Sequence, residues 1–284
     1  MRRLWAAAAL AAVAVAGTAF AQQAETVPLD LSGPRPIAML QVGDAEAVPV
    51  IFDTGASGNV LDADFARAMG LPDDGAAQVG TPAGGPPMIG FRTRIQGRLG
   101  NAVLRDVRAV ALPMPVMQRL AVKGVFGPGT FSGRLVHLDL ARGEIRVTDR
   151  SPALIPSGTA FPYSGSGMRS LPGVTVEIGG RSFEGHLDTG QPGTFVFPTA
   201  MAAQLPLDGP LRPRDPARLA DGVPRNAYDA RLRATIRVGP LVFENPEVRF
   251  MDGIDRVNVG MGALRGATLV FDPAERRSWI VPPS

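Results

Sequence analysis

The chain has 284 residues, with 29 Lys and Arg against 26 Asp and Glu, 34 Gly, 27 Pro, two His and no Cys. Without cysteine it can form no disulfide and cannot be a lipoprotein acylated on cysteine, and two histidines alone argue against a structural zinc site. The arginines are scattered and form no basic block beside a recognisable motif, so we expect no nucleic-acid partner.

Residues 1–21 have the pattern of an export signal. Arg2-Arg3 is the charged start, Leu4 to Gly17 is apolar, and Ala19-Phe20-Ala21 fits a cleavage site with small residues. The apolar stretch is short and alanine-rich, which favours a cleaved signal over a membrane anchor. We therefore expect a periplasmic or secreted protein with no stable membrane anchor after cleavage, in which residues 22–34 are an N-terminal lead-in.

The first predicted elements surround the triplet Asp53-Thr54-Gly55, which closes an apolar run. In chain order they are a strand over Ile37 to Val42, a turn at Gly43-Asp44, a return strand over Val48 to Phe52, a short helix over Asp62 to Met69 with Asp62 as its N-cap, a hairpin signal at Arg98 to Asn101, and Val125-Phe126-Gly127 before a closing pair of strands.

The same elements return in the same order after a connection rich in Ser, Pro and Gly over residues 151–171. They are a strand over Val174 to Ile178, a turn at Gly179-Gly180, a return strand over Arg181 to Leu187, the triplet Asp188-Thr189-Gly190, a short helix over Pro198 to Leu205 with Pro198 in its first turn, a hairpin signal at Arg237 to Pro240, and Asn258-Val259-Gly260 before closing strands. The spacing is nearly constant, with 74 residues from Asp53 to Gly127 and 72 from Asp188 to Gly260. This ordered repeat predicts a tandem duplication.

The predicted strands are short and bounded by Gly and Pro, which favours a mostly β protein built from barrels or sandwiches. The run Phe52 to Ser57, a Gly-rich hairpin after it, and Val125-Phe126-Gly127 resemble aspartic peptidases. The first copy is most similar to the retropepsin-like group, and two such lobes in one chain resemble the bilobal pepsin-like arrangement. The resemblance covers roughly residues 35–148 and 172–282.

The resemblance implies two closed barrels related by an internal pseudo-two-fold duplication, with an N-terminal lobe over 35–150, a C-terminal lobe over 172–284 and a cleft between them. It also implies an aspartic endopeptidase that hydrolyses a peptide or unfolded protein substrate. The water would be activated by Asp53 and Asp188, with no metal and no cofactor. Because one chain carries both aspartates, we expect a monomer.

The residue types of the triplets suit this chemistry. Each strand delivers its aspartate into a tight turn, where we expect Gly55 and Gly190 to supply backbone freedom. Two carboxyl groups at one site share a proton and titrate as a unit, so the ionised one can take a proton from water while the protonated one polarises a carbonyl. The resemblance implies that Thr54 and Thr189 cross-bond the two turns.

The two copies differ after the triplet. Ser57 sits where its hydroxyl could hydrogen-bond Asp53, but Pro192 fills the matching position and has no hydroxyl. Gln191 could support Asp188 through its amide.

A flap is expected over residues 80–89, with Gly84 and Gly85 at its mobile hairpin tip. Pepsin-like enzymes usually place a tyrosine there and retropepsin-like flaps do not; this segment has none. In the second copy the matching segment over 207–226 is rich in proline and predicts an irregular surface loop.

Two alternatives remain beside the peptidase. Pro192 motivates a non-catalytic peptide-binding pseudoprotease of the same fold. A structural envelope β protein would leave both triplets as ordinary turns. The only histidines, His137 and His186, lie in strand-like runs and are expected to pack or face solvent rather than bind a metal.

Overall fold

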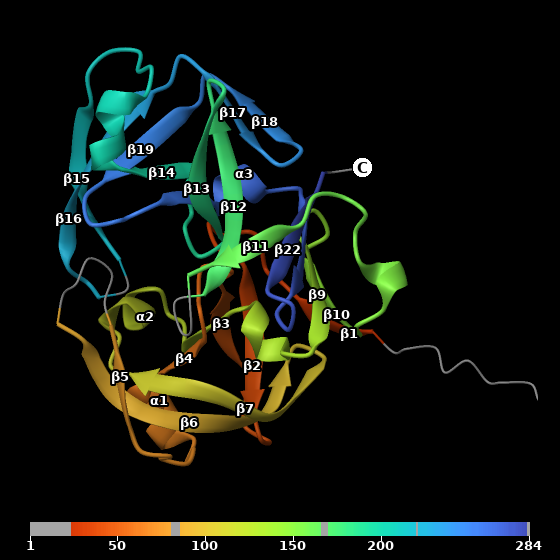
Figure 1. Cartoon of the computed structure of the whole chain (residues 1–284). Helices are drawn as coiled ribbons and strands as arrows, with labels where there is room; N and C mark the ends of the chain where they lie inside the picture. The colour runs from red at the N-terminus through yellow and green to blue at the C-terminus, as the bar shows by residue number, and fades with distance from the viewer. Residues whose placement is uncertain (1–23, 81–85, 166–169, 220, 283–284) are drawn as a thin grey trace, which may run out of the picture.

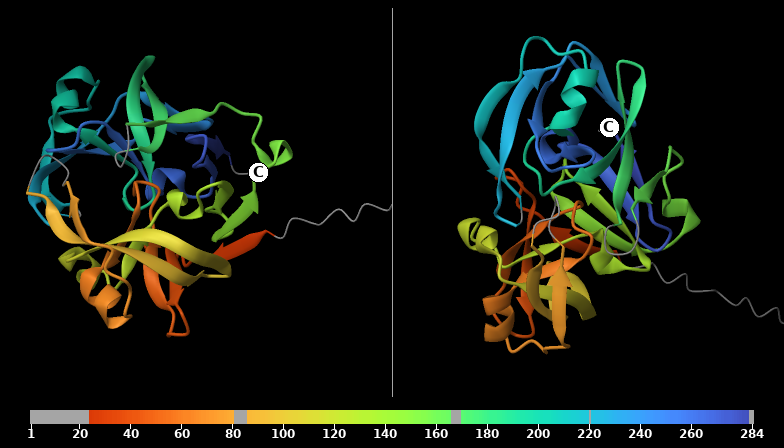
Figure 2. Two further views of the ribbon diagram at one scale, coloured as in Figure 1. Left: turned by 60° about the horizontal axis from the view of Figure 1, so that its bottom comes forward. Right: turned by 60° about the vertical axis from the view of Figure 1, so that its left-hand side comes forward.

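Two β lobes face each other across a sheet to which both halves of the chain contribute (Figures 1 and 2). In this computed structural model the described residues are 24–80, 86–165, 170–219 and 221–282. The predicted export signal over 1–21 and the predicted flap glycines Gly84 and Gly85 lie outside them. None of the helices in the described ranges is long and apolar enough to cross a bilayer.

The first lobe is a closed barrel of strands in the order β2-β3-β8-β4-β7-β6, closed by pairing of β6 with β2. These strands are β2 (Ile37–Val42), β3 (Val48–Phe52), β4 (Asn59–Asp62), β6 (Met88–Leu99), β7 (Ala102–Leu112) and β8 (Gly124–Phe126), and β5 (Ala76–Val79) adds to the edge of β6. The hairpin strands predicted before the first triplet are confirmed. Alternate residues such as Ala38, Leu40 and Val50 are fully buried, because successive side chains of a strand point to opposite faces and one face points into the barrel.

The second lobe repeats this order as β12-β13-β20-β14-β19-β16. Its strands are β12 (Leu171–Ile178), β13 (Arg181–Asp188), β14 (Phe195–Pro198), β16 (Pro224–Arg231), β17 (Thr235–Val238), β18 (Leu241–Glu244), β19 (Glu247–Met251) and β20 (Val257–Gly260). Where the first lobe has the long strands β6 and β7, this lobe has the shorter pairs β16 and β17, and β18 and β19. Strand β17 pairs with β12, as β6 pairs with β2. The predicted bilobal duplication is confirmed.

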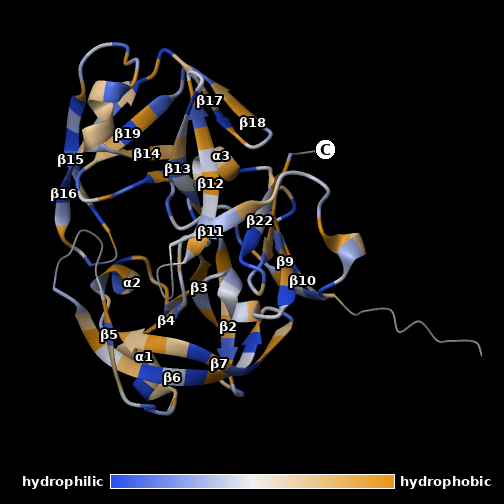
Figure 3. Ribbon diagram, in the orientation of Figure 1, coloured by the Kyte–Doolittle hydropathy of each residue, from blue (hydrophilic) through white to orange (hydrophobic). Residues whose placement is uncertain are grey.

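The segment over 207–226 is not the irregular loop that its prolines predicted. It contains β15 (Arg212–Arg218), which pairs with β16 as a hairpin and shifts register between Arg214 and Ala217. Strand β15 lies at the edge of the sheet, where proline removes no ladder hydrogen bond that the sheet needs. Its residues are mostly exposed and hydrophilic (Figure 3).

The closing strand pairs of both copies join into one sheet between the lobes, in the order β1-β10-β9-β21-β22-β11. Its strands are β1 (Glu25–Pro28), β9 (Arg134–Asp139), β10 (Glu144–Asp149), β11 (Phe161–Ser164), β21 (Thr268–Asp272) and β22 (Arg277–Val281). Strands β9 and β21 meet in its middle, so the two copies share continuous backbone hydrogen bonding. The expected lead-in contributes β1, and the expected connection contributes β11.

The helices of the described residues are few and short. They are α1 (Ala63–Ala68), α2 (Pro115–Arg119) and α3 (Met261–Leu264), with 3-10 turns over Pro128–Phe131, Pro152–Leu154 and Thr199–Gln204. Asp62 caps α1 as predicted, because its carboxylate accepts from the Phe65 backbone N–H at 3.0 Å. The helix predicted in the second copy is the 3-10 turn over Thr199–Gln204, and Pro198 precedes it.

Candidate active site

Each triplet begins where a strand of its lobe ends. Strand β3 runs parallel to β8 with Phe52 opposite Phe126, and β13 runs parallel to β20 with Asp188 opposite Gly260. Phe52 and Leu187, the residues before the two aspartates, are fully buried. The packed strand ends therefore fix where both turns start.

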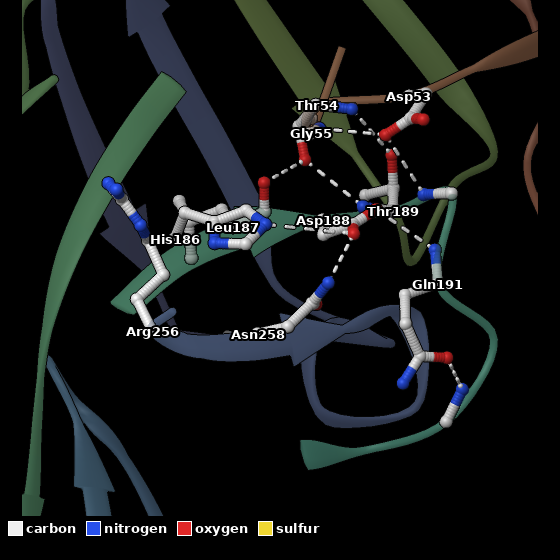
Figure 4. A network of polar contacts seen from close by, with 12 residues as sticks. Asp53, Thr54, Gly55, His186, Leu187, Asp188, Thr189, Gln191, Arg256 and Asn258 are labelled. Atoms are coloured by element: carbon white, nitrogen blue, oxygen red, sulfur yellow. Dashed lines mark hydrogen bonds and ion pairs between the residues drawn. The ribbon is translucent and has the colours of Figure 1, made fainter. Parts of the chain in front are cut away.

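Thr54 and Thr189 join the two turns through crossed hydrogen bonds (Figure 4). Each backbone N–H donates to the hydroxyl of the other threonine at 3.1 Å. The Thr54 hydroxyl donates to the Leu187 carbonyl and the Thr189 hydroxyl to the Phe52 carbonyl, both at 2.8 Å. Both threonines are 0% exposed, so these bonds lie away from water, where unpaired groups are costly.

Gly55 and Gly190 each lie against the aspartate of the other lobe. A Cβ atom on Gly55 would stand 2.7 Å from Asp188 Cγ, and one on Gly190 would stand 2.4 Å from Asp53 Oδ2. Neither glycine has the left-handed φ that would demand glycine, so the expectation of backbone freedom is wrong and the requirement is space. This close approach brings Asp53 and Asp188 to one site.

Asp53 accepts two backbone N–H groups on its Oδ1 atom, from Gly55 at 2.7 Å and from Gly190 at 3.2 Å. Burial, the charge of Asp188 and hydrogen bonding with the Asp188 carboxyl outweigh these donors and raise the pKa of Asp53 well above its ordinary value.

Asp188 has a different set of partners. Its Oδ1 accepts the Gln191 backbone N–H at 3.0 Å, and its Oδ2 accepts Asn258 Nδ2 at 2.5 Å. His186 Nε2 lies 3.8 Å from the same Oδ2. Burial acts to raise the pKa of Asp188, but the interactions with His186, and then the hydrogen bond from Asn258, outweigh burial and lower that pKa.

The opposite pKa shifts divide two possible roles between the carboxyl groups. Over an intermediate range of pH, Asp53 keeps its proton and Asp188 is ionised. Such a pair can accept a proton at one carboxylate and donate a hydrogen bond from the other carboxyl group. In the described part of the chain, no group of His, Asp and Glu side chains is arranged to hold a metal ion.

The predicted support from Ser57 is not found. Ser57 is exposed and, in the described ranges, donates no hydrogen bond to Asp53. Gln191 does support Asp188, but through its backbone N–H, because its side-chain Oε1 accepts instead from the Gly193 N–H. The two lobes therefore hold their aspartates by different means.

His186 and Asn258 are site residues that the sequence reading missed. We expected His186 to pack or to face solvent. However, it lies two residues before Asp188, and residues two apart in a strand lie on the same face. Asn258 could have been found from the repeat, because it matches the apolar Val125 of the first copy. A third missed residue is Arg35, whose Nε donates to the Gly190 carbonyl at 2.6 Å and ties the chain before β2 to the second turn.

A cavity of about 230 Å³ opens beside the second turn. Gln191, Gly193 and Thr194 of the turn line it together with the apolar Phe195 and Val248 and the charged Arg214, Asp229, Glu247 and Arg249. The carboxylate of Asp229 pairs with Arg214 at 2.9 Å and with Arg249 at 3.2 Å. The surface that continues from the turn therefore combines apolar side chains with paired charges.

Comparison with known proteins agrees with this geometry. The model of a family described as aspartyl protease matches residues 38–127 and again residues 174–265, one match in each lobe. The fold is similar to the crystal structure of Basic 7S globulin from soybean, with a TM-score of 0.51 and 14% sequence identity over 92% of this chain and 95% of that one. The comparison with curated proteins found no match. Since the family model covers most of both lobes, the chain belongs to the aspartyl protease family.

Proposed function

We propose that this protein is an exported aspartic endopeptidase in which Asp53 and Asp188 activate one water molecule. The observation that carries the proposal is the pair of crossed threonine bonds, which brings one carboxyl group from each lobe to a single site. The opposite pKa shifts of the two groups support separate roles for them.

The proposed reaction begins with Asp188 ionised and Asp53 protonated. Asp188 takes a proton from the water molecule while the water oxygen bonds to the peptide carbonyl carbon. At the same time Asp53 gives its proton to the carbonyl oxygen. The resulting diol collapses when Asp188 protonates the amide nitrogen and Asp53 takes a proton back from one hydroxyl. The C–N bond breaks, and the dyad returns to its starting state.

Hydrolysis of an unfolded protein by the chain from residue 22 tests this function, assayed between pH 3 and pH 8. We expect Asp53→Asn and Asp188→Asn to lower kcat/KM at least about 100-fold, because either change removes one half of the acid–base pair. The matched control is Asp64→Asn, since that side chain is 82% exposed on α1 and should leave hydrolysis unchanged. Equal hydrolysis by all four proteins would refute the proposal.

The second candidate is a peptide-binding protein without turnover. Pro192, together with the turn of the Gln191 side chain toward Gly193, favours it, because Asp188 receives no side-chain hydroxyl from its own turn. Capture of peptides without cleavage at every pH, unaffected by both Asn substitutions, would favour this candidate over the enzyme.

Export and monomeric state belong to the same proposal. The basis for export is the pattern over residues 1–21, and the basis for a monomer is that one chain supplies both aspartates. Expression of the full chain in a bacterium with an outer membrane should yield a periplasmic or secreted protein that starts at Gln22 by mass spectrometry. It should sediment at the mass of one chain. An intact Met1 in the cytosol, or a stable dimer, would contradict these parts.

A further inference from the structure

The two lobes differ in the pair of facing residues that lies next to each aspartate on the paired strands. In the first lobe Ile51, two residues before Asp53, lies opposite Val125 of β8. In the second lobe His186, two residues before Asp188, lies opposite Asn258 of β20. The same register therefore places an apolar pair under one carboxyl group and a polar pair under the other.

The apolar pair packs into the first lobe. Ile51 is buried in a small cluster with Leu112, Met114, Met117 and Val122, against which Val125 also packs. Neither side chain has a polar atom to offer Asp53. Within the described residues, the hydrogen bonds that the Asp53 carboxyl group accepts accordingly come from backbone N–H groups, those of Gly55 and Gly190.

The polar pair converges on one oxygen of Asp188 (Figure 4). Asn258 Nδ2 donates to Oδ2 at 2.5 Å, and His186 Nε2 lies 3.8 Å from it. Their other polar atoms, His186 Nδ1 and Asn258 Oδ1, are buried without a hydrogen-bond partner in the described part of the chain. Burying two polar side chains in this way costs stability, which natural sequences tolerate mainly at functional sites.

His186 faces the carboxylate of Asp188, and the other charges around His186 largely balance one another. Apart from Asp188, the charged groups around it include Glu184, two residues earlier on the same strand, Asp255, and Arg256 (Figure 4). Arg256 pairs with Asp255 at 3.0 Å and with Glu184 at 3.4 Å, and donates to Ser164 at 2.8 Å. On β12 the residue opposite His186 is Gly173, which carries no charge. The positive charge of Arg256 is therefore balanced by the carboxylates of Asp255 and Glu184.

We propose that His186 and Asn258 are positioning residues that hold Asp188 as the ionised member of the dyad, in place of the hydroxyl that Pro192 cannot supply. The proposal rests on the proposed function and extends it by assigning unequal roles to the two lobes: Asp188 is the base and Asp53 is the acid. Removal of either positioning side chain leaves both carboxyl groups in place but makes Asp188 harder to ionise.

The test uses substitutions that copy the first lobe, His186→Ile and Asn258→Val. Each should move the acid limb of the kcat/KM profile about one pH unit upward, which corresponds to an about tenfold loss at pH values below that limb. KM should change little, because neither side chain is proposed to contact the peptide. His186→Gln keeps a side-chain N–H donor and should recover part of the shift.

The matched control is Asn226→Val, which removes an amide that donates to Asp252 at 3.0 Å on the exposed surface. It should leave the acid limb where it is. A shift of equal size in this control would show a general effect of lost amides and overturn the assignment.

A second readout does not depend on activity. With ¹³C-labelled aspartate carboxyl groups, and Asp53→Asn to assign the signals, NMR titration should show Asp188 ionising before Asp53, with a smaller gap in His186→Ile and Asn258→Val. If the wild-type protein cleaves no peptide, the proposed function fails while this titration still decides the inference. If the order of ionisation and the gap are the same in all variants, the inference is wrong even when the enzyme is active.

Discussion

Replacing Thr54 by valine removes one hydroxyl without changing the shape of the side chain. That hydroxyl accepts from the Thr189 N–H at 3.1 Å and donates to the Leu187 carbonyl at 2.8 Å. The change therefore takes a partner from two backbone groups at a site that water does not reach. An unsatisfied buried group costs about 1–3 kcal/mol, so we expect Thr54→Val to lower the free energy of unfolding by about 2–6 kcal/mol.

Thr93 offers a matched control. It is also fully buried, but its hydroxyl has no hydrogen-bond partner in the described ranges. Thr93→Val should be neutral or stabilise by about 1 kcal/mol, because it removes the cost of burying an unpaired hydroxyl. Thr54→Ser keeps the hydroxyl and should lose only about 1 kcal/mol for the missing methyl group.

Urea denaturation followed by tryptophan fluorescence and circular dichroism measures these differences, and Thr189→Val should behave like Thr54→Val. The reasoning fails if Thr54→Val and Thr93→Val change stability by the same amount. That result would mean that the crossed bonds do not hold the lobes together.

Three further predictions follow from other contacts. Gly190→Ala places a Cβ atom 2.4 Å from Asp53 Oδ2 and should lower kcat/KM about 100-fold, because the Asp53 carboxylate is displaced. A Cβ atom at Gly58 would have no atom within 4 Å, so Gly58→Ala should leave kcat/KM unchanged. Equal effects of the two substitutions on kcat/KM would refute the steric argument. Burial lowers the pKa of His137 from 6.5 to about 4, so the unfolded chain binds the proton first as pH falls. About 3 kcal/mol of stability should be lost between pH 6.5 and pH 4, as measured by urea denaturation, and a slope that persists unchanged in His137→Phe would contradict this assignment. Asp62→Ala should cost about 1 kcal/mol by removing the α1 cap while Asp62→Asn costs less, and equal losses would argue against capping.

The elements that sequence could predict are those with local signals. The hairpin before the first triplet follows from strand alternation around Gly43, and α1 follows from the capping side chain of Asp62. The repeat then predicts where the second copy has the same elements. The sequence could also predict that the two triplets meet. Each triplet stands at the same place in a repeated series of elements, and such a repeat implies a site on a pseudo-two-fold axis.

The rest depends on pairing between distant strands. His186 and Asn258 meet only because β13 and β20 are parallel and in one register, which no local pattern reports. Strand β15 has the composition of a loop and is a strand because β16 offers it an edge. The role predicted for Ser57 rests on its spacing alone, and in the structure the residue is exposed.

A crystal structure with a bound peptide isostere, in which a secondary hydroxyl replaces the scissile carbonyl, tests the central claim most directly. That hydroxyl stands in for the attacking water and one oxygen of the diol. We predict that it lies within hydrogen-bonding distance of Asp53 and Asp188 at the same time, in a cleft between the lobes. An isostere bound elsewhere, or a hydroxyl that contacts neither carboxyl group, would contradict the account.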